Sequence, residues 1–145
     1  MAETFDNIKH GKYVVELAAG YSVFKEVTAP QIGAFGEKDL GGANFTIGYS
    51  YIDKPLLMVN KTHKHDFNQI IMFLGRDSNC VEFDSESDFT IDGKVYHITY
   101  PACIYINKMT SHGPLNIKRV TKPIMFFDIV LHPVPSTREN QILVN

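Results

Sequence analysis

Two histidines and a glutamine have the residue types and the spacing of a metal site. His63 and His65 are separated by one residue in the run "THKHDFNQ", which ends at Gln69. On a β-strand, residues i and i+2 point to the same side, so both imidazoles would face one ion. On a helix the same spacing would turn the two rings apart. We therefore take His63 and His65 as candidate metal ligands, with Gln69 as a third candidate where a carboxylate would be usual.

The elements that would position these side chains are short β-strands. Runs rich in Val, Ile, Tyr, Phe and Thr suit a pleated, half-buried surface. They cover residues 13–17, 21–27, 44–52, 56–59, 68–74, 79–83, 88–91, 95–99, 103–107, 116–120 and 124–131. Asp92-Gly93 is the strongest hairpin signal in the chain, and it predicts that Asp88–Ile91 pairs with Lys94–Thr99.

Little in the sequence predicts helices. The stretch Ala29–Ala43 holds one proline and four glycines and is predicted to be a loop. No long segment shows an apolar period of 3.6 residues, so we expect helices to be few and short. Many short strands at close spacing indicate an all-β sandwich or barrel. No linker composition divides the chain, so we expect one domain over residues 1–145.

The pattern His-x-His-x3-Gln, followed far downstream by His-x3-Asn, resembles the two conserved motifs of the cupin superfamily. His63, His65, His112 and Asn116 match motif positions, and Gln69 stands at the position of the usual glutamate. Gly75 falls one residue before the last glycine of the first motif. In the second motif, Asn107 replaces a proline and Met109 replaces a glycine. The region that carries the resemblance is Val59–Leu131.

The resemblance implies a cupin-type double-stranded β-helix, which is a jelly-roll barrel, with few short helices. It implies that His63, His65 and His112 hold one divalent ion, and that small cupins of this kind form homodimers. Imidazole-rich sites suit Zn, Cu, Fe and Ni, whereas magnesium and calcium prefer oxygen-rich sites. The expected ion is Fe, Ni, Zn, Mn or Cu, and the sequence does not choose among these five. Gln69 either binds the ion through its amide oxygen or orients a histidine or water by hydrogen bonding. As a neutral donor it would leave the ion more electrophilic than a carboxylate would.

Four further side chains are candidates for a substrate pocket. Phe73 shares a strand face with Gln69, and Tyr105 could place a hydroxyl near the ion, although core packing is the commoner role of such aromatic residues. Asn116 lies four residues past His112, where capping or turn stabilisation is an equal alternative. Asp128 stands inside the apolar run "PIMFFDIVL", so its carboxylate must be paired, solvent-facing or functional.

Composition limits the partners and the compartment. The formal net charge is −2, and no motif that reads nucleic acid is present, so neither nucleic acid nor a membrane surface is an expected partner. No apolar run approaches the roughly 18 residues of a membrane span. The first residues lack the features of a secretory signal, which predicts a cytoplasmic protein. Cys80 and Cys103 are expected to be reduced and to pack as small core residues.

These observations leave three classes of function. The first is a metal-dependent enzyme acting on a small oxygenated or cyclic compound, with dioxygenase, isomerase or hydrolase-type chemistry. The second is a non-catalytic module that binds a small ligand or a metal. The third is a structural role in which strands pair across a dimer, and this role is compatible with either of the others. The fold alone does not decide among them.

Overall fold

The computed structural model describes residues 5–21, 27, 29–76, 81–136 and 140–144, and strands dominate this part of the chain. The strands are β1 (Ile8–His10), β2 (Val14–Glu16), β3 (Gln31–Phe35), β4 (Thr46–Ile52), β5 (Leu56–Val59), β6 (His63–Lys64), β7 (Gln69–Gly75), β8 (Ser85–Ile91), β9 (Lys94–Ile98), β10 (Ala102–Ile106), β11 (His112–Val120), β12 (Ile124–Val130) and β13 (Ile142–Leu143). One short helix, α1, spans Gly36–Asp39. The expected all-β class is confirmed.

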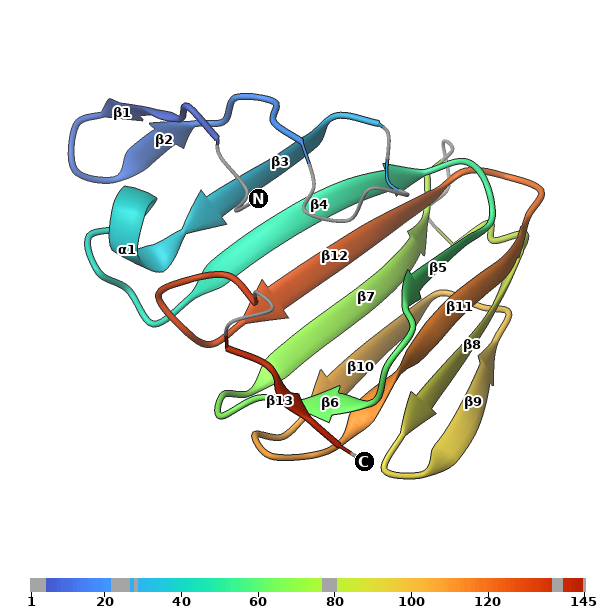
Figure 1. The fold of residues 1–145 in the computed structure, drawn as a ribbon. Helices are drawn as coiled ribbons and strands as arrows, with labels where there is room; N and C mark the ends of the chain where they lie inside the picture. The colour runs from blue at the N-terminus through green and yellow to red at the C-terminus, as the bar shows by residue number, and fades with distance from the viewer. Residues whose placement is uncertain (1–4, 22–26, 28, 77–80, 137–139, 145) are drawn as a thin grey trace.

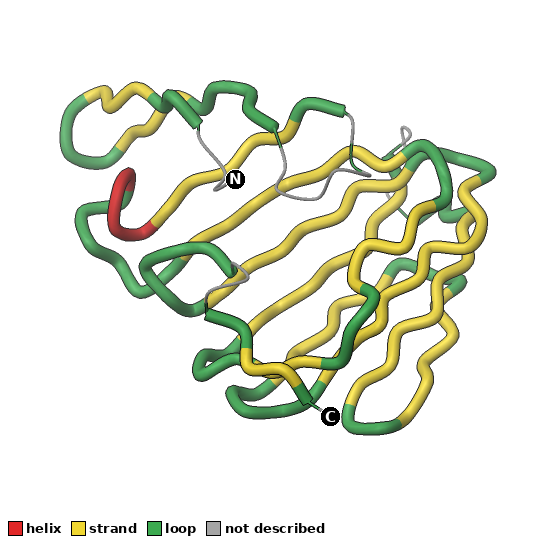
Figure 2. The backbone as a smooth tube through the Cα atoms, in the orientation of Figure 1, coloured by secondary structure: helices red, strands yellow, loops and turns green. Residues whose placement is uncertain are grey.

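Two antiparallel sheets form the body of the molecule (Figure 1). The five-stranded sheet has the order β10-β7-β12-β4-β3, and the six-stranded sheet has the order β13-β6-β11-β8-β9, with β5 also paired to β11. Strands β1 and β2 form a separate hairpin that extends past the end of β3. The tube in Figure 2 shows that loops are confined mainly to the two ends of the strands. Among the described residues, no helix is long and apolar enough to cross a membrane.

The hydrophobic core lies between the two sheets and draws on both. Phe73 and Phe126 come from the five-stranded sheet, and Phe89, Leu115 and Ile117 come from the six-stranded sheet; all five are buried. Successive side chains of a β-strand point to opposite faces, so each strand can send every second side chain into this core. In β7, every second residue from Gln69 to Gly75 is buried, and the residues between them are half-buried.

The hairpin predicted at Asp92-Gly93 is confirmed. Strands β8 and β9 pair with Ile91 opposite Lys94, and the two turn residues have φ angles of 50° and 77°. Positive φ at both central residues is the geometry of the tight turns that fit the twist of antiparallel strands, and Asp-Gly supplies it at low steric cost.

Two sequence predictions are wrong. The stretch Ala29–Ala43 is not a loop throughout, because it contains β3 and α1. Its Gly33 marks a close approach within a strand, since a Cβ there would lie 3.0 Å from the Phe5 ring and 3.2 Å from the Ile47 carbonyl oxygen. Residues 81–83 are not strand, and the rest of the predicted strand 79–83 lies outside the described residues. Most of the predicted strand 21–27 also lies outside them.

Candidate metal centre

Strand pairing brings the three motif histidines together. His63 in β6 lies directly opposite His112 in β11, and His65 follows just after β6. The turn before β11 is tied to this segment, because the Met109 amide donates to the His65 carbonyl oxygen over 2.6 Å. Met109 has a φ of 63°, a left-handed backbone conformation that glycine adopts more readily than other residues.

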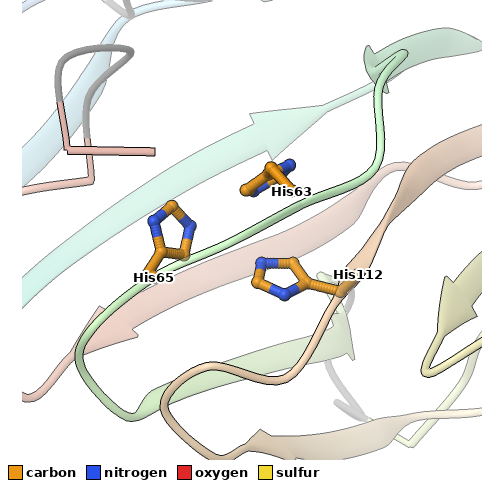
Figure 3. A group of neighbouring side chains, drawn as sticks. All are labelled: His63, His65 and His112. Carbon is orange, nitrogen blue, oxygen red and sulfur yellow. The ribbon is translucent and has the colours of Figure 1, made fainter. Parts of the chain in front are cut away.

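The three imidazoles face a common space (Figure 3). Their ring centroids are 4.4 Å apart for His63 and His112, 4.7 Å for His63 and His65, and 5.2 Å for His65 and His112. One ring nitrogen from each lies within 4.8 Å of the other two, so the group could hold a metal ion. All three side chains are buried.

Backbone carbonyls fix which nitrogen is available in two of the three rings. The Nδ1 atom of His63 donates to the Lys61 carbonyl oxygen over 3.1 Å, and Nδ1 of His112 donates to the Thr110 carbonyl oxygen over 2.9 Å. A carbonyl oxygen only accepts, so Nδ1 carries the proton and Nε2 keeps its lone pair in the neutral ring. The Nε2 atom of His112 is buried and has no hydrogen-bond partner among the residues that the structure describes. An electron-pair acceptor such as a metal ion would satisfy it, so the donor set fits an ion.

Burial also favours the neutral state that binds metals. It lowers the pKa of His63, and it lowers the pKa of His112 to about 4. The pKa of His65 is lowered to about 4 as well, mainly by burial and further by the neighbouring His63 and His112 rings. Near pH 7 the three rings are therefore unprotonated, and no proton has to leave before an ion binds.

Gln69 and Asp128 form a hydrogen-bonded pair beside the histidines. The Gln69 amide nitrogen donates to Asp128 Oδ1 over 2.8 Å. The Gln69 amide oxygen is buried and has no hydrogen-bond partner within the described part of the chain. Burial raises the pKa of the Asp128 carboxyl, and the hydrogen bond from Gln69 offsets part of that rise. Asp128 keeps some accessible surface because it borders a cavity. The pair thus leaves an acceptor oxygen, rather than the amide nitrogen, for a bound ion or ligand.

One cavity collects most of the residues that the sequence singled out. We call it the histidine cavity; its walls are Met58, Val59, His63, His65, Gln69, Ile71, Phe89, His112, Leu115, Phe126, Asp128, Ser136 and Gln141. All four predicted metal-site residues line it, and so does Asp128. Phe73 does not, because it is 0% exposed and packs edge-on against Phe126 in the core, with a centroid distance of 5.3 Å.

Two predicted pocket residues point away from the histidine cavity. Tyr105 is 55% exposed and pairs with Ile70 on the outer face of its sheet, whereas its neighbours in β10 at positions 104 and 106 point inward. Asn116 is exposed on β11. In a regular strand it would share a face with His112, but the pairing shifts register between His112 and Leu115, and this irregularity turns Asn116 outward. Cys103, predicted to be a core residue, is also exposed.

Several wall and neighbour residues were missed by sequence reasoning. The Phe67 ring stacks on His65 at a centroid distance of 4.7 Å and an angle of 12°. The Ser136 hydroxyl lies 3.3 Å from His65 Nε2. Phe67 lies two residues past His65, but it stands in the bend between β6 and β7, so strand spacing does not predict the contact. Ser136 comes from the distant segment after β12, and nothing in its local sequence indicates the contact.

Comparison with known proteins identifies the fold. No protein-family model matches the sequence, and no curated protein matches it. A putative ethanolamine utilization protein Q from Salmonella typhimurium is 12% identical, with a TM-score of 0.52 over 93% of this chain and 98% of that chain. Oxalate decarboxylase from Bacillus subtilis, a protein with Mn(II) centres, is 9% identical, with a TM-score of 0.50 over 79% of this chain and 28% of that one. A cupin-2 domain from Rhodospirillum rubrum is 12% identical, with a TM-score of 0.48 over 80% and 65%. At these identities the likeness concerns the fold.

Proposed function

We propose that this protein, whose fold is a cupin-type double-stranded β-helix, is a metal-dependent enzyme acting on a small oxygen-bearing compound. His63, His65 and His112 would hold one divalent transition-metal ion of the Fe, Ni, Zn, Mn or Cu group. The observation that supports this most is the buried cluster of three neutral imidazoles, in which backbone carbonyls hold Nδ1 of His63 and His112 and Nε2 is left for an ion. Such an ion, when bound, supplies Lewis-acid activation of a coordinated oxygen atom, or of O2 if it is redox-active.

The residues around the imidazoles have separate tasks. The Lys61 and Thr110 carbonyls hold two of the rings in one tautomer, and Phe67 fixes the plane of the third by stacking. Asp128 holds the Gln69 amide so that its oxygen remains available, either to the ion or to a ligand beside it. Burial of the site excludes bulk water, which strengthens each of these polar contacts. Dioxygenase, isomerase and hydrolase-type chemistry are all compatible with this arrangement.

Metal content tests the site directly. The purified protein should contain close to one transition-metal ion per chain by mass spectrometry, and His63→Ala and His112→Ala should each lose it. His97→Ala is the matched control, because His97 is exposed and forms ion pairs with the surface carboxylates of Glu86 and Asp88. Full metal content in both site variants would contradict the assignment.

Turnover separates an enzyme from a binding module. The loaded protein should transform at least one member of a panel of diketones, phenols and hydroxy acids, followed by oxygen uptake and by product mass. Uptake of O2 would indicate an oxygenase, and product without uptake would indicate isomerase or hydrolase-type chemistry. Metal that binds at the histidines while no panel member reacts would favour the non-catalytic module.

A further inference from the structure

A second cavity adjoins the histidine cavity and shares part of its wall. Met58, Phe126, Asp128 and Ser136 line both cavities. We call the second one the Gly48 chamber; its remaining walls are Gln31, Phe35, Thr46, Gly48, Ser50, Val130 and Pro135. Because the two spaces share these four wall residues, they lie next to each other in the molecule.

The chamber exists because a glycine occupies the middle of β4. Strand pairing places Gly48 directly beside Asp128 of β12. Among the described residues, a Cβ at Gly48 would meet only the Asp128 carbonyl oxygen, at 3.9 Å. Its φ is outside the left-handed region, so no backbone conformation requires a glycine. The neighbouring Gly33 differs, because Phe5 already fills the space above it. A glycine inside a strand is otherwise unfavourable, and an unfilled one marks room for a ligand.

The chamber wall combines apolar side chains with several polar ones, and none of its described residues is positively charged. Gln31, Thr46 and Ser50 are all buried, and the Gln31 amide nitrogen donates to the Ser50 hydroxyl oxygen. A hydroxyl that accepts this hydrogen bond still has its own proton to donate. Among the described residues that line either cavity, none is Lys or Arg, and Asp128 is the one carboxyl. A second anionic group buried here would find no cation to offset its desolvation, whereas a neutral hydroxyl or carbonyl would find hydrogen-bond partners.

We propose that the Gly48 chamber binds the distal end of the substrate, and that this end is an uncharged group bearing hydroxyl or carbonyl oxygen. Gln31 and Ser50 would recognise the oxygen, and the missing side chain at Gly48 would set the size of the group. This inference rests on the proposed function, in which the reacting end of the same molecule binds at the histidines. It narrows the substrate class to small compounds with at most one anionic group.

The chamber proposal can be tested by measuring, with calorimetry, how tightly the Zn(II)-loaded protein binds three hydroxamates that differ only in their tails. Acetohydroxamate carries only the metal-binding group, 4-hydroxybutanehydroxamate adds a neutral hydroxyl tail, and succinic monohydroxamate adds a carboxylate tail. We expect the hydroxyl tail to bind at least tenfold more tightly than the carboxylate tail. Gly48→Leu should remove the gain from the hydroxyl tail while leaving acetohydroxamate binding within twofold. Tyr49→Leu, on the opposite face of the same strand, is the matched control.

Ser50→Ala provides a second route that leaves the chamber open, and it should also weaken the hydroxyl-tailed ligand and spare acetohydroxamate. Equal binding of the two tails, or a hydroxyl-tailed ligand that is insensitive to both Gly48→Leu and Ser50→Ala, would overturn the chamber proposal. Failure of acetohydroxamate to bind the unaltered loaded protein would instead overturn the metal centre. The two proposals therefore fail in different arms of the experiment.

Discussion

The five-stranded sheet turns polar side chains toward the interior of the molecule, whereas the six-stranded sheet turns charged side chains toward solvent. The inner face of the five-stranded sheet carries Gln31, Thr46, Ser50, Gln69 and Asp128. Its outer face is apolar and half-buried, with Ile47, Tyr49, Tyr51, Ile70, Met72, Leu74, Met125, Phe127 and Ile129. The Tyr49 and Phe127 rings on that face are in contact, with centroids 5.2 Å apart.

The six-stranded sheet follows the usual rule of apolar side chains inside and charged ones outside. Its outer face carries ion pairs, including Arg119 with Glu86 at 2.7 Å and Lys118 with Asp88 at 3.0 Å. Its inner face is apolar apart from the histidines and the buried Ser85 and Ser87 of β8. The difference shows that alternation in a sequence groups residues by face but does not say which face is inside. Where the polar set points inward, a binding site is the expected reason.

The largest effect is expected on the free energy of unfolding, and it should differ between the inner and outer faces of the five-stranded sheet. Phe73→Ala should lower the free energy of unfolding by about 3–5 kcal/mol, because it removes a fully buried ring and leaves a cavity. Met72→Ala, its neighbour on the outer face, should cost less than half as much. Urea denaturation of the two variants checks this. A similar loss in both would mean that the outer face is as tightly covered as the core.

Acid should destabilise the metal-free protein because the buried histidines take up protons when the chain unfolds. The pKa values of His65 and His112 are about 4 in the folded state, below the ordinary value of 6.5, so between these values the unfolded chain binds protons that the folded chain does not. Stability is therefore complete above pH 6.5 and falls as the pH drops toward 4. Each ring should cost roughly 2 kcal/mol at pH 5.

Urea midpoints of the metal-free protein at pH 7 and pH 5 measure this loss. A His65→Gln variant should lose less stability over the same interval, because it has one buried imidazole fewer to protonate on unfolding. Identical midpoints for the unaltered protein at both pH values would contradict the prediction.

The apolar outer face should be covered by a second copy of the chain, as the family resemblance implies. The residues named on this face lie on β4, β7 and β12, and strand spacing gives them a footprint of roughly 330 Å². A standard interface hides about 800 Å² on each partner, so the face would supply the apolar centre of a two-fold contact. Phe127→Lys should convert a dimer into a monomer, as measured by light scattering after size exclusion. Val95→Lys, on the outer side of the other sheet, should leave the dimer intact. An unaltered protein that is monomeric at micromolar concentration would contradict the prediction.

The smallest expected effects concern the two residues that point away from the histidine cavity. Tyr105→Phe and Asn116→Ala should leave metal content and acetohydroxamate binding within twofold, because neither side chain lines either cavity. Their effect on stability should be within about 0.5 kcal/mol, as for other surface changes. A tenfold loss of ligand binding in either variant would show that the site extends to the outer surface.

Sequence spacing was sufficient for the histidines and insufficient for much of the pocket. His63 and His65 are two residues apart, and strand geometry alone puts them on one face. The side chain of Asn116 could not be placed in the same way, because the count from His112 crosses a register shift that depends on the partner strand. The Gly48 chamber was also not predictable, since its walls come from β3, β4, β12 and the segment after β12, and only their pairing brings them together.

The carbonyls that hold the histidines have a consequence for how the chain tolerates change. The partners of His63 and His112 are the backbone oxygens of Lys61 and Thr110, each two residues earlier in the chain. A backbone oxygen is present whatever side chain the residue carries. Substitutions at positions 61 and 110 should therefore leave the tautomer of both rings unchanged, provided that the local backbone conformation is kept. The orientation of His63 and His112 thus depends on the backbone fold rather than on neighbouring side chains, and most single substitutions should not change it.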